Sequence, residues 1–260
     1  MLQTINYMEK PPLIYKYTRI NENLKSSLRE SYIWFSKSDS LNDPFDLAYP
    51  PGVHKEITTQ RMVVLLNQMR EKGKKMKDKL PDGIDVDGAI DNMINYIGSK
   101  EYDDFFETRR EQIIEKIPFA VCCFTEEYNN MLMWSHYADN HKGVCMMYYL
   151  QEDPELFKVL AKVVYSGKLP LTNDIQYDTV ISLLTKSPEW HYEREWRILQ
   201  LTSGKASINR ACLKGIRFGC NTKDETIQDV INTCNESGYD WLSFYKMEKT
   251  DGFKLLSRDI

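Results

Sequence analysis

Short runs of β-branched and aromatic residues, separated by polar turns, occur near both ends of the chain and predict its strands. The first two runs are residues 14–18 and 32–36. Residues 118–125 form a continuous apolar run of the kind that fits a buried central strand. Further strands are expected at residues 144–150, 162–165, 196–201 and 214–219, with a closing hairpin made of 241–247 and 252–256.

Apolar residues at helical spacing occupy the middle of the chain. They recur in three series, which are Val63, Leu66 and Met69, then Ile90, Ile94 and Ile97, then residues 105–117. Glycines and Pro81 separate the series. We therefore expect two or three helices in a lobe inserted at residues 54–117. Further helices are predicted at residues 21–29, where Asn21 is the expected N-cap, and at 131–138, 179–184 and 224–235.

The order of these elements predicts the fold class. Strands lie on both sides of the helical segment, and the regular strand–helix alternation of a doubly wound fold is missing. We therefore predict an α+β fold with a mixed, mostly antiparallel sheet. The whole chain, residues 1–260, is expected to form a single domain that carries the helical insertion at 54–117.

Composition and charge exclude several classes of protein. Apolar residues make up 42% of the chain, which is typical of globular proteins. Lysine and arginine (34) nearly balance aspartate and glutamate (38), so a large basic surface that binds nucleic acid is not expected. The lysine-rich run at 72–79 leaves a local nucleic-acid contact open. The first ten residues lack the pattern of a signal peptide, and no apolar run is long enough to span a bilayer. We expect a soluble, cytoplasmic protein without a membrane partner.

Cysteines and histidines offer little support for a metal site. The six cysteines include no C-x-x-C pair, and most lie in apolar surroundings, where reduced thiols behave as small hydrophobic side chains. His136 and His141 are five residues apart, a weak spacing for sharing one metal ion. No phosphate-binding loop, dinucleotide fingerprint or nucleophile elbow occurs either. We predict free thiols and no metal.

The segment from Lys186 to Gln200 concentrates charged and aromatic residues. On an extended backbone the side-chain period is two, so Glu193, Glu195 and Arg197 would share one face. The opposite row contains Tyr192, Arg194, Trp196 and Ile198, and its apolar members are expected to face a core. This charged row has two interpretations, a functional site and a Glu–Arg pair that neutralises itself on the sheet surface. Trp134 and Tyr137 likewise either line a pocket with His141 or belong to the core.

Ordered sequence blocks carry a resemblance to a known family. The blocks are Ile14-Tyr15-Lys16-Tyr17, Trp34-Phe35-Ser36, Leu41-Asn42-Asp43-Pro44-Phe45-Asp46, Cys123-Phe124-Thr125, Met133-Trp134-Ser135-His136-Tyr137, His141-Lys142-Gly143, Tyr192-Glu193-Arg194-Glu195-Trp196-Arg197 and Lys214-Gly215-Ile216-Arg217-Phe218-Gly219. Together they resemble a widespread bacterial family known only as domain-of-unknown-function family 2971. The blocks follow one another along nearly the whole chain. The family name implies no chemistry.

A more distant resemblance does imply a chemistry. The opening strand, helix and second strand, followed later by Glu193-Arg194-Glu195, are similar to the arrangement of ADP-ribosyltransferase-like folds. Carried over, Glu195 is the catalytic glutamate, Glu193 the substrate-side residue and Ser36 the middle-position residue. The first-strand position, normally His or Arg, falls on Lys16 or Tyr17 here, so the residue that fills it is left open.

These observations lead to one hypothesis about function. The resemblance implies that the protein binds NAD as a substrate and acts as an ADP-ribosyltransferase or NAD glycohydrolase. An unknown protein or nucleic acid would be the acceptor, and a bacterial toxin or phage-defence system is an expected setting. The cleft is predicted to gather the catalytic Glu193, Glu195 and Ser36 with the NAD-binding Lys16, Tyr17, Trp34, Asn42, Asp43, Trp134, Tyr137, His141 and Arg197. The alternative is a non-catalytic module that binds a nucleotide or nucleic acid.

Overall fold

A computed structural model describes residues 9–37, 41–43, 46, 55–75, 85–115, 119–168, 181 and 183–260. The chain divides into two compact units, of which the larger comprises residues 1–46, 118–167 and 186–260. The smaller unit comprises residues 47–117 and 168–185. Each unit is described by itself below.

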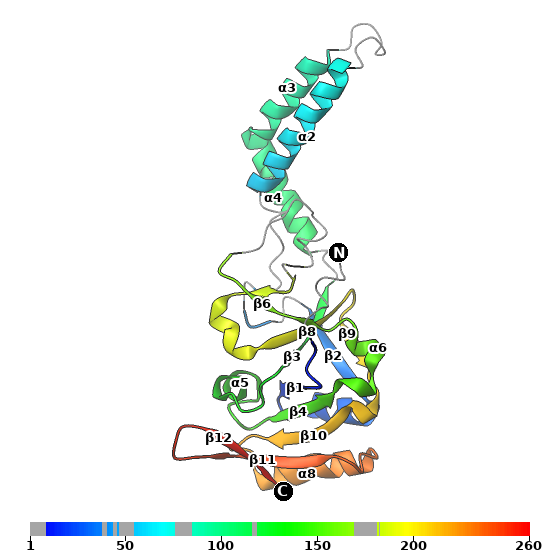
Figure 1. The fold of residues 1–260 in the computed structure, drawn as a ribbon, viewed down its shortest axis with the longest axis vertical. Coiled ribbons are helices and arrows are strands. Elements are labelled where there is room, and N and C mark those ends of the chain that lie inside the picture. Colours follow the sequence, from blue (N-terminus) through cyan, green and yellow to red (C-terminus); the bar gives the residue numbers. More distant parts are fainter. Residues whose placement is uncertain are drawn as a thin grey trace. The chain divides into compact units, whose positions relative to one another are not determined.

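An open, mostly antiparallel sheet forms the larger unit (Figure 1). Its strands are β1 (Leu13–Thr18), β2 (Tyr32–Lys37), β3 (Ala120–Thr125), β4 (Val144–Tyr149), β5 (Ala161–Lys162), β8 (Glu195–Gln200), β9 (Gly204–Ser207), β10 (Leu213–Phe218), β11 (Ser243–Lys249) and β12 (Leu255–Asp259). Two short strands, β6 (Val164–Tyr165) and β7 (Thr185–Lys186), lie outside this sheet. Only β10 and β11 pair in parallel among the strand pairs described. The α+β class and the mostly antiparallel sheet are therefore confirmed.

Helices cover both faces of this sheet, because residues along a strand alternate between two cores. Ile14 of β1 packs with Leu24 and Leu28 in the larger core, whereas Tyr15 and Tyr17 belong to the second core. The helices of this unit are α1 (Glu22–Glu30), α5 (Met131–Tyr137), α6 (Pro154–Phe157) and α8 (Asp224–Glu236), with 3₁₀ helices η5 (Leu150–Glu152), η6 (Pro188–Glu193) and η7 (Arg210–Cys212). Helices α1 and α8 contribute to the larger core and α5 to the second core.

The sheet forks at β3. One edge of β3 pairs with β8 over its whole length, from Ala120 opposite Gln200 to Thr125 opposite Glu195. The other edge is shared, since β1 pairs with it only at Thr125 and β2 pairs with it only at Val121 and Ala120. Between these two contacts β1 and β2 diverge and leave the middle of β3 without a strand partner on that side. This fork positions the candidate site.

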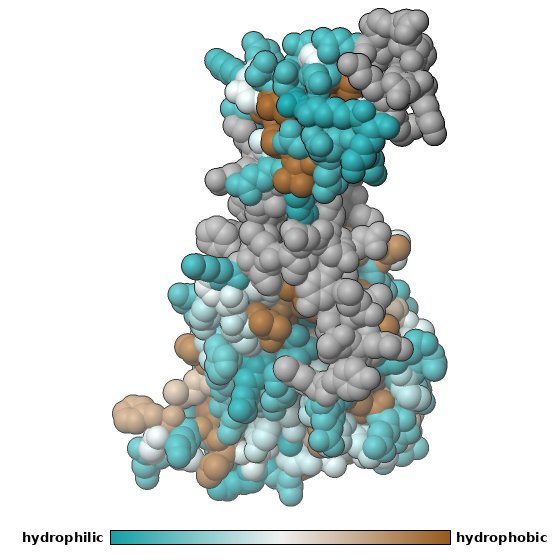
Figure 2. Space-filling view, turned by 45° about the horizontal axis from the view of Figure 1, so that its top comes forward, coloured by the Kyte–Doolittle hydropathy of each residue, from teal (hydrophilic) through white to brown (hydrophobic). Residues whose placement is uncertain are grey.

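The smaller unit contains three helices, α2 (Lys55–Lys75), α3 (Val86–Ile97) and α4 (Lys100–Glu115). Leu66, Ile90, Ile97 and Tyr102 form its buried cluster. These helices confirm the three predicted apolar series. Figure 2 shows apolar side chains among the polar surface of the helices, and the exposed ones include Val64, Leu65, Met69, Met93 and Phe105. The prediction of one domain with an insertion bounded at 54 and 117 stays a prediction.

The structure bears out most of the predicted elements of the larger unit. Asn21 caps α1 as expected, with its side chain accepting a hydrogen bond from the backbone N–H of Leu24 at 3.1 Å. Strand β9 was missed, because glycine and lysine in 204–207 lack a β-strand pattern. The helix predicted at 179–184 lies partly outside the described residues, as do Pro44 and Phe45 of the sequence block at residues 41–46.

The prediction of extended backbone through residues 192–194 is wrong. Residues up to Glu193 belong to η6, and Arg194 adopts a left-handed conformation with φ of 42° before β8 begins. Pro188 at the first turn favours this helix, since its ring fixes a helical φ. Trp196 and Ile198 nevertheless face the core as predicted.

None of the helices that the structure describes combines the length and the apolar character needed to cross a bilayer.

A tight turn joins α5 to β4 and depends on a glycine that directly follows β10. Asp139, Asn140 and His141 all have positive φ, of 46°, 52° and 68°. The His141 carbonyl accepts a hydrogen bond from the Asn221 backbone N–H at 2.9 Å. Gly219 lies so close beneath it that a Cβ there would overlap the His141 carbonyl. A side chain at this position would therefore push the turn away from β10.

Gly219→Ala is expected to lower the free energy of unfolding by about 1–3 kcal/mol, the range for a forced steric overlap. Gly252→Ala is the matched control, because a Cβ at Gly252 meets no atom within 4 Å. Urea unfolding followed by far-UV circular dichroism measures both. Equal stability of the two variants would contradict this account of the turn.

Candidate functional site

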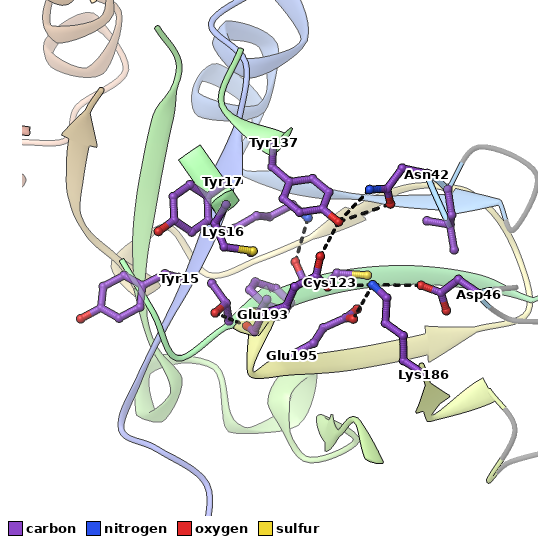
Figure 3. A pocket seen from close by; sticks show the side chains of 14 residues that line it. Tyr15, Lys16, Tyr17, Asn42, Asp46, Cys123, Tyr137, Lys186, Glu193 and Glu195 are labelled. Carbon is purple, nitrogen blue, oxygen red and sulfur yellow. Dashed lines mark hydrogen bonds and ion pairs between the residues drawn. The ribbon is translucent and has the colours of Figure 1, made fainter. Parts of the chain in front are cut away.

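A pocket opens beside the fork, on the face of the sheet that α5 covers (Figure 3). Its volume, including the mouth that is open to solvent, is about 500 Å³. Tyrosines and apolar side chains form much of its wall, and carboxylates and a lysine lie at its base. The lining residues are Tyr15, Lys16, Tyr17, Leu41, Asn42, Asp46, Cys123, Phe124, Thr125, Met133, Tyr137, Lys186, Glu193 and Glu195.

Lys186 is the centre of a buried ionic network at this base. Its ammonium group lies 2.7 Å from Glu193 Oε2, 3.2 Å from Glu195 Oε2 and 3.3 Å from Asp46 Oδ2. The Trp190 ring covers the same ammonium group at 4.7 Å from its centroid. Only 5% of the Lys186 surface is exposed, so solvent weakens these ion pairs far less than it weakens surface pairs.

Arg197 supplies the second cation and fixes the orientation of Glu195. Its Nε donates to Glu195 Oε1 at 2.7 Å, and its Nη2 donates to Glu195 Oε2 at 3.0 Å. The same Nη2 donates to Asp46 Oδ2 at 2.7 Å. Arg197 is fully buried and does not line the pocket. The guanidinium group therefore holds Glu195 from behind, while the carboxylate faces the cavity.

Glu193 links the network to the pocket wall. Tyr137 donates its hydroxyl hydrogen to Glu193 Oε1 at 2.6 Å, and the side chain of Asn42 donates to the Tyr137 oxygen at 3.0 Å. Figure 3 shows this chain of contacts from Asn42 through Tyr137 to Glu193. Lys186 holds the other oxygen of the same carboxylate. Both Glu193 oxygens are thus oriented by neighbours from different segments.

Among the described residues of this network, three carboxylates share the two basic groups Lys186 and Arg197, so these five groups together carry one negative charge when all are ionised. Burial raises the pKa of Glu193 against the opposing effect of Lys186, and the nearby Glu195 raises it further. The pKa of Glu195 responds differently, because Arg197 and Lys186 outweigh the effect of burial and lower it from 4.5 to about 2. Of the two glutamates, Glu193 therefore takes up a proton more readily than Glu195.

Lys16 lies at the fork itself. Its ammonium group donates to the Cys123 carbonyl at 3.1 Å, in the middle of the β3 edge that β1 and β2 leave open. It also lies 5.5 Å from the centroid of the Phe124 ring. A backbone carbonyl without a strand partner thus gains a side-chain donor, and a positive charge is held at the pocket wall.

The pocket brings together six of the residues predicted from sequence. Lys16, Tyr17, Asn42, Tyr137, Glu193 and Glu195 line it, and Arg197 contacts Glu195 from behind. The remaining predicted residues do not line it. Trp34 lines a second pocket, Trp134 is completely buried against Tyr17, and Ser36 lies on β2 opposite Val121. His141 lies in the turn after α5, and the backbone carbonyl of Asp43 accepts from the Asp46 N–H at 3.0 Å.

Sequence reasoning missed Lys186 and Asp46 as site residues. Lys186 opens the charged and aromatic stretch, and Asp46 closes the polar block that contains Asn42. A buried row with two glutamates and one arginine needs a further cation to compensate its negative charge. This requirement could have identified Lys186 from the sequence. No group of three or more potential metal-ligating side chains is found among the described residues, and Lys186 lies between the three carboxylates. The base of the pocket therefore offers charged groups and hydrogen bonds to a ligand.

Removing Arg197 should strongly destabilise the protein. Arg197→Met leaves Glu195 without its bidentate partner, and breaking a buried ion pair in this way costs about 3–5 kcal/mol. The control is Arg258→Met, which removes an exposed ion pair with Glu248 (3.0 Å) and should cost less than about 1 kcal/mol. Urea unfolding compares the two free energies. Similar losses in both variants would show that the network does not stabilise the fold.

Acid should weaken the network through Glu195. Its pKa in the folded protein lies below the ordinary value of 4.5, so its stabilising contribution is complete above pH 4.5 and is lost as the pH falls toward 2. The free energy of unfolding of the wild type should therefore fall more steeply below pH 4.5 than that of Glu195→Gln. Substituting the exposed Glu236 by Gln should leave the steep slope unchanged. Parallel curves for wild type and Glu195→Gln would contradict the assignment.

Comparison with known proteins gives one match. The family model described as "Protein of unknown function (DUF2971)" matches residues 133–198, a segment that contains Tyr137, Lys186, Glu193 and Glu195. No curated protein and no solved structure shows a significant match to the chain. The matched segment runs from the helix that carries Tyr137 to the strand that carries Glu195. This match and the ordered sequence blocks together support a resemblance of the chain to the DUF2971 family of proteins of unknown function.

Proposed function

We propose that this pocket binds NAD and that Glu195 supports cleavage of the bond between nicotinamide and ribose. The observation that carries the proposal is a buried pair of glutamates, oriented by Lys186 and Arg197, that faces an aromatic-lined pocket. The protein would then act as an ADP-ribosyltransferase, or as an NAD glycohydrolase when water is the acceptor. The fold resemblance in the sequence supports the same chemistry by analogy alone.

The charge of the network suits this reaction. Loss of nicotinamide leaves positive charge on the ribose, and a fixed carboxylate nearby stabilises such a transition state. Because Arg197 and Lys186 lower the pKa of Glu195, this carboxylate stays ionised at neutral pH. Its orientation is set in advance by the bidentate contact with Arg197. No nucleophilic side chain and no metal ion are needed for this step.

Glu193 fits the substrate-side role. It can accept a proton from an attacking hydroxyl or amine, since burial raises its pKa above the ordinary value. Tyr137 orients one of its oxygens toward the pocket side, and Lys186 holds the other. The acceptor is a protein, a nucleic acid or water, and a bacterial conflict system is the setting that we propose.

A second pocket, lined by residues of the larger core such as Leu24, Met146 and Tyr148, is the place that we propose for the rest of the dinucleotide. It has a volume of about 900 Å³ including its open mouth, and Lys16 lines both pockets. Trp34, which is 51% exposed, and Lys205 also line it, and they offer a ring for stacking and a cation for phosphate. We propose that nicotinamide enters the pocket at Glu195, that Lys16 contacts the diphosphate, and that the adenosine half lies beside Trp34.

A binding module without catalysis is the second candidate. One observation favours it: Arg197 and Lys186 both contact Glu195, so its charge is already compensated within the protein. In that case the network shapes a pocket for a nucleotide or nucleic acid, and turnover is absent. Binding and cleavage are therefore measured separately.

Glu195→Gln should lower the rate of nicotinamide release from NAD by about 10²–10³-fold, the loss typical of one preorganised electrostatic group. Glu189→Gln is the control, since Glu189 is exposed on the same segment and should change the rate little. Purified proteins are incubated with labelled NAD, with and without cell lysate, and nicotinamide and transferred label are quantified. Circular dichroism verifies that each variant is folded.

The result that would remove the enzyme proposal is a folded wild-type protein that binds NAD without releasing nicotinamide. Glu193→Gln gives a second test if Glu195→Gln fails to fold. It should lower transfer to an acceptor more than it lowers hydrolysis of NAD, because only transfer needs the base on the substrate side. If the wild-type protein does not bind NAD at all, NAD is excluded as the substrate of the enzyme and as the ligand of the binding module.

A further inference from the structure

Arg217 belongs to a sequence block, residues 214–219, that the candidate site does not use. It lies on β10, between Cys145 of β4 and Tyr245 of β11. Only 8% of its surface is exposed. A buried guanidinium group is costly unless its charge is compensated, so its surroundings indicate what the residue does.

Three tyrosine rings surround this guanidinium group. Its central carbon lies 4.4 Å from the centroid of Tyr128, 4.5 Å from that of Tyr245 and 5.5 Å from that of Tyr15. These rings stabilise the cation by cation–π attraction. The rings also cover the faces of the guanidinium group, so hydrogen bonds to other groups form through the nitrogen atoms at its edge.

The edge of the guanidinium group lacks an anionic partner among the described residues. Nη1 donates only to the Met147 sulfur at 3.5 Å, which is a weak acceptor. Nε is buried and has no hydrogen-bond partner. Nη2 has no hydrogen-bond acceptor among the described residues and, unlike Nε, is not fully buried. Nη2 can therefore donate to an acceptor from outside, and Nη1 can exchange its weak sulfur partner for a stronger acceptor.

The hydroxyl groups of the three tyrosines are further hydrogen-bond donors beside Arg217. The hydroxyls of Tyr15, Tyr128 and Tyr245 have no hydrogen-bond partner among the described residues, and none of the three is fully buried. Gly215 lies two residues before Arg217 on β10, and a Cβ there would lie 2.9 Å from the Ser243 carbonyl and close to Met147 and Tyr245. The absence of a side chain at Gly215 therefore lets Met147 and Tyr245 lie close to the backbone of β10.

We propose that Arg217 and its three tyrosines bind a carboxylate of a protein segment. A carboxylate accepts two parallel hydrogen bonds from the terminal nitrogens of a guanidinium group, and the phenol hydroxyls add further donors. The cage holds one cation among aromatic rings, which matches a single carboxylate flanked by apolar surface. Nucleic acid is disfavoured because its phosphates call for several cations, and the chain as a whole carries a net charge of −4.

Tyr15 joins this cage to the candidate pocket. Its ring contributes to the cation–π contacts of Arg217 and also lines the pocket that contains Glu195. A carboxylate held by Arg217 therefore lies one tyrosine ring away from that pocket. This placement suits a docking position for a protein acceptor, but the binding of the carboxylate does not depend on NAD cleavage.

Acetate is the probe for a direct test. The Nε–H resonances of the full-length protein, labelled with ¹⁵N in its arginines, are followed by NMR during titration with sodium acetate. Sodium chloride at equal ionic strength is the reference. A saturable shift of the Arg217 signal is expected with acetate and not with chloride. The Arg197 signal is the internal control and should not shift, because Arg197 already bonds to Glu195.

Two variants separate binding from folding. Arg217→Lys keeps the charge but loses the paired donors, and it should weaken acetate binding, followed through a tyrosine resonance of the cage, by about tenfold or more. Tyr128→Leu keeps Arg217, opens one face of the cage and should weaken binding as well. The absence of a saturable shift in the folded wild type, or tighter binding of inorganic phosphate than of acetate, would overturn the proposal. The nicotinamide-release assay is independent, so failure of one proposal is distinguishable from failure of the other.

Discussion

The ammonium group of Lys186 holds together parts of the chain that are far apart in sequence. It contacts Asp46 of the sequence block at residues 41–46, Glu193 at the end of η6 and Glu195 at the start of β8. The same three carboxylates would repel one another at this distance without a cation between them. The base of the pocket therefore exists only because Lys186 and Arg197 are buried with them. Ion pairing, rather than apolar packing, sets the geometry of the site.

The fork in the sheet explains why such a charged cluster has a cavity in front of it. If β1 and β2 both paired with β3 along its length, they would compete for one edge. The register instead gives each of them one end, and Lys16 satisfies a carbonyl between them. Side chains of α5 then close one side of the opening, with Tyr137 reaching Glu193. A cavity with one polar base and aromatic walls is the outcome of that shared edge.

The sequence predicted the local features of this protein better than its long-range contacts. Alternation along 195–198 correctly placed Glu195 and Arg197 on one face and Trp196 on the other, because a strand has a fixed period. Trp134 shows the limit, since a tryptophan and a tyrosine three apart on a helix can line a pocket or a core. Trp134 is fully buried, whereas Tyr137 reaches the pocket. The pairing of Asp46 with Lys186 spans 140 residues and leaves no local pattern.

The shared edge of β3 also bears on how the protein reaches its native state. Strands β1 and β2 end before residue 38, whereas β3 begins at Ala120, so the central pairings close a very long loop. Contacts of such large sequence separation form slowly, because chain entropy is lost before they stabilise the fold. The three helices within that loop make contacts with one another that are local in sequence. If they collapse first, they shorten the effective distance between β2 and β3, and the order of folding is then from the helices to the sheet.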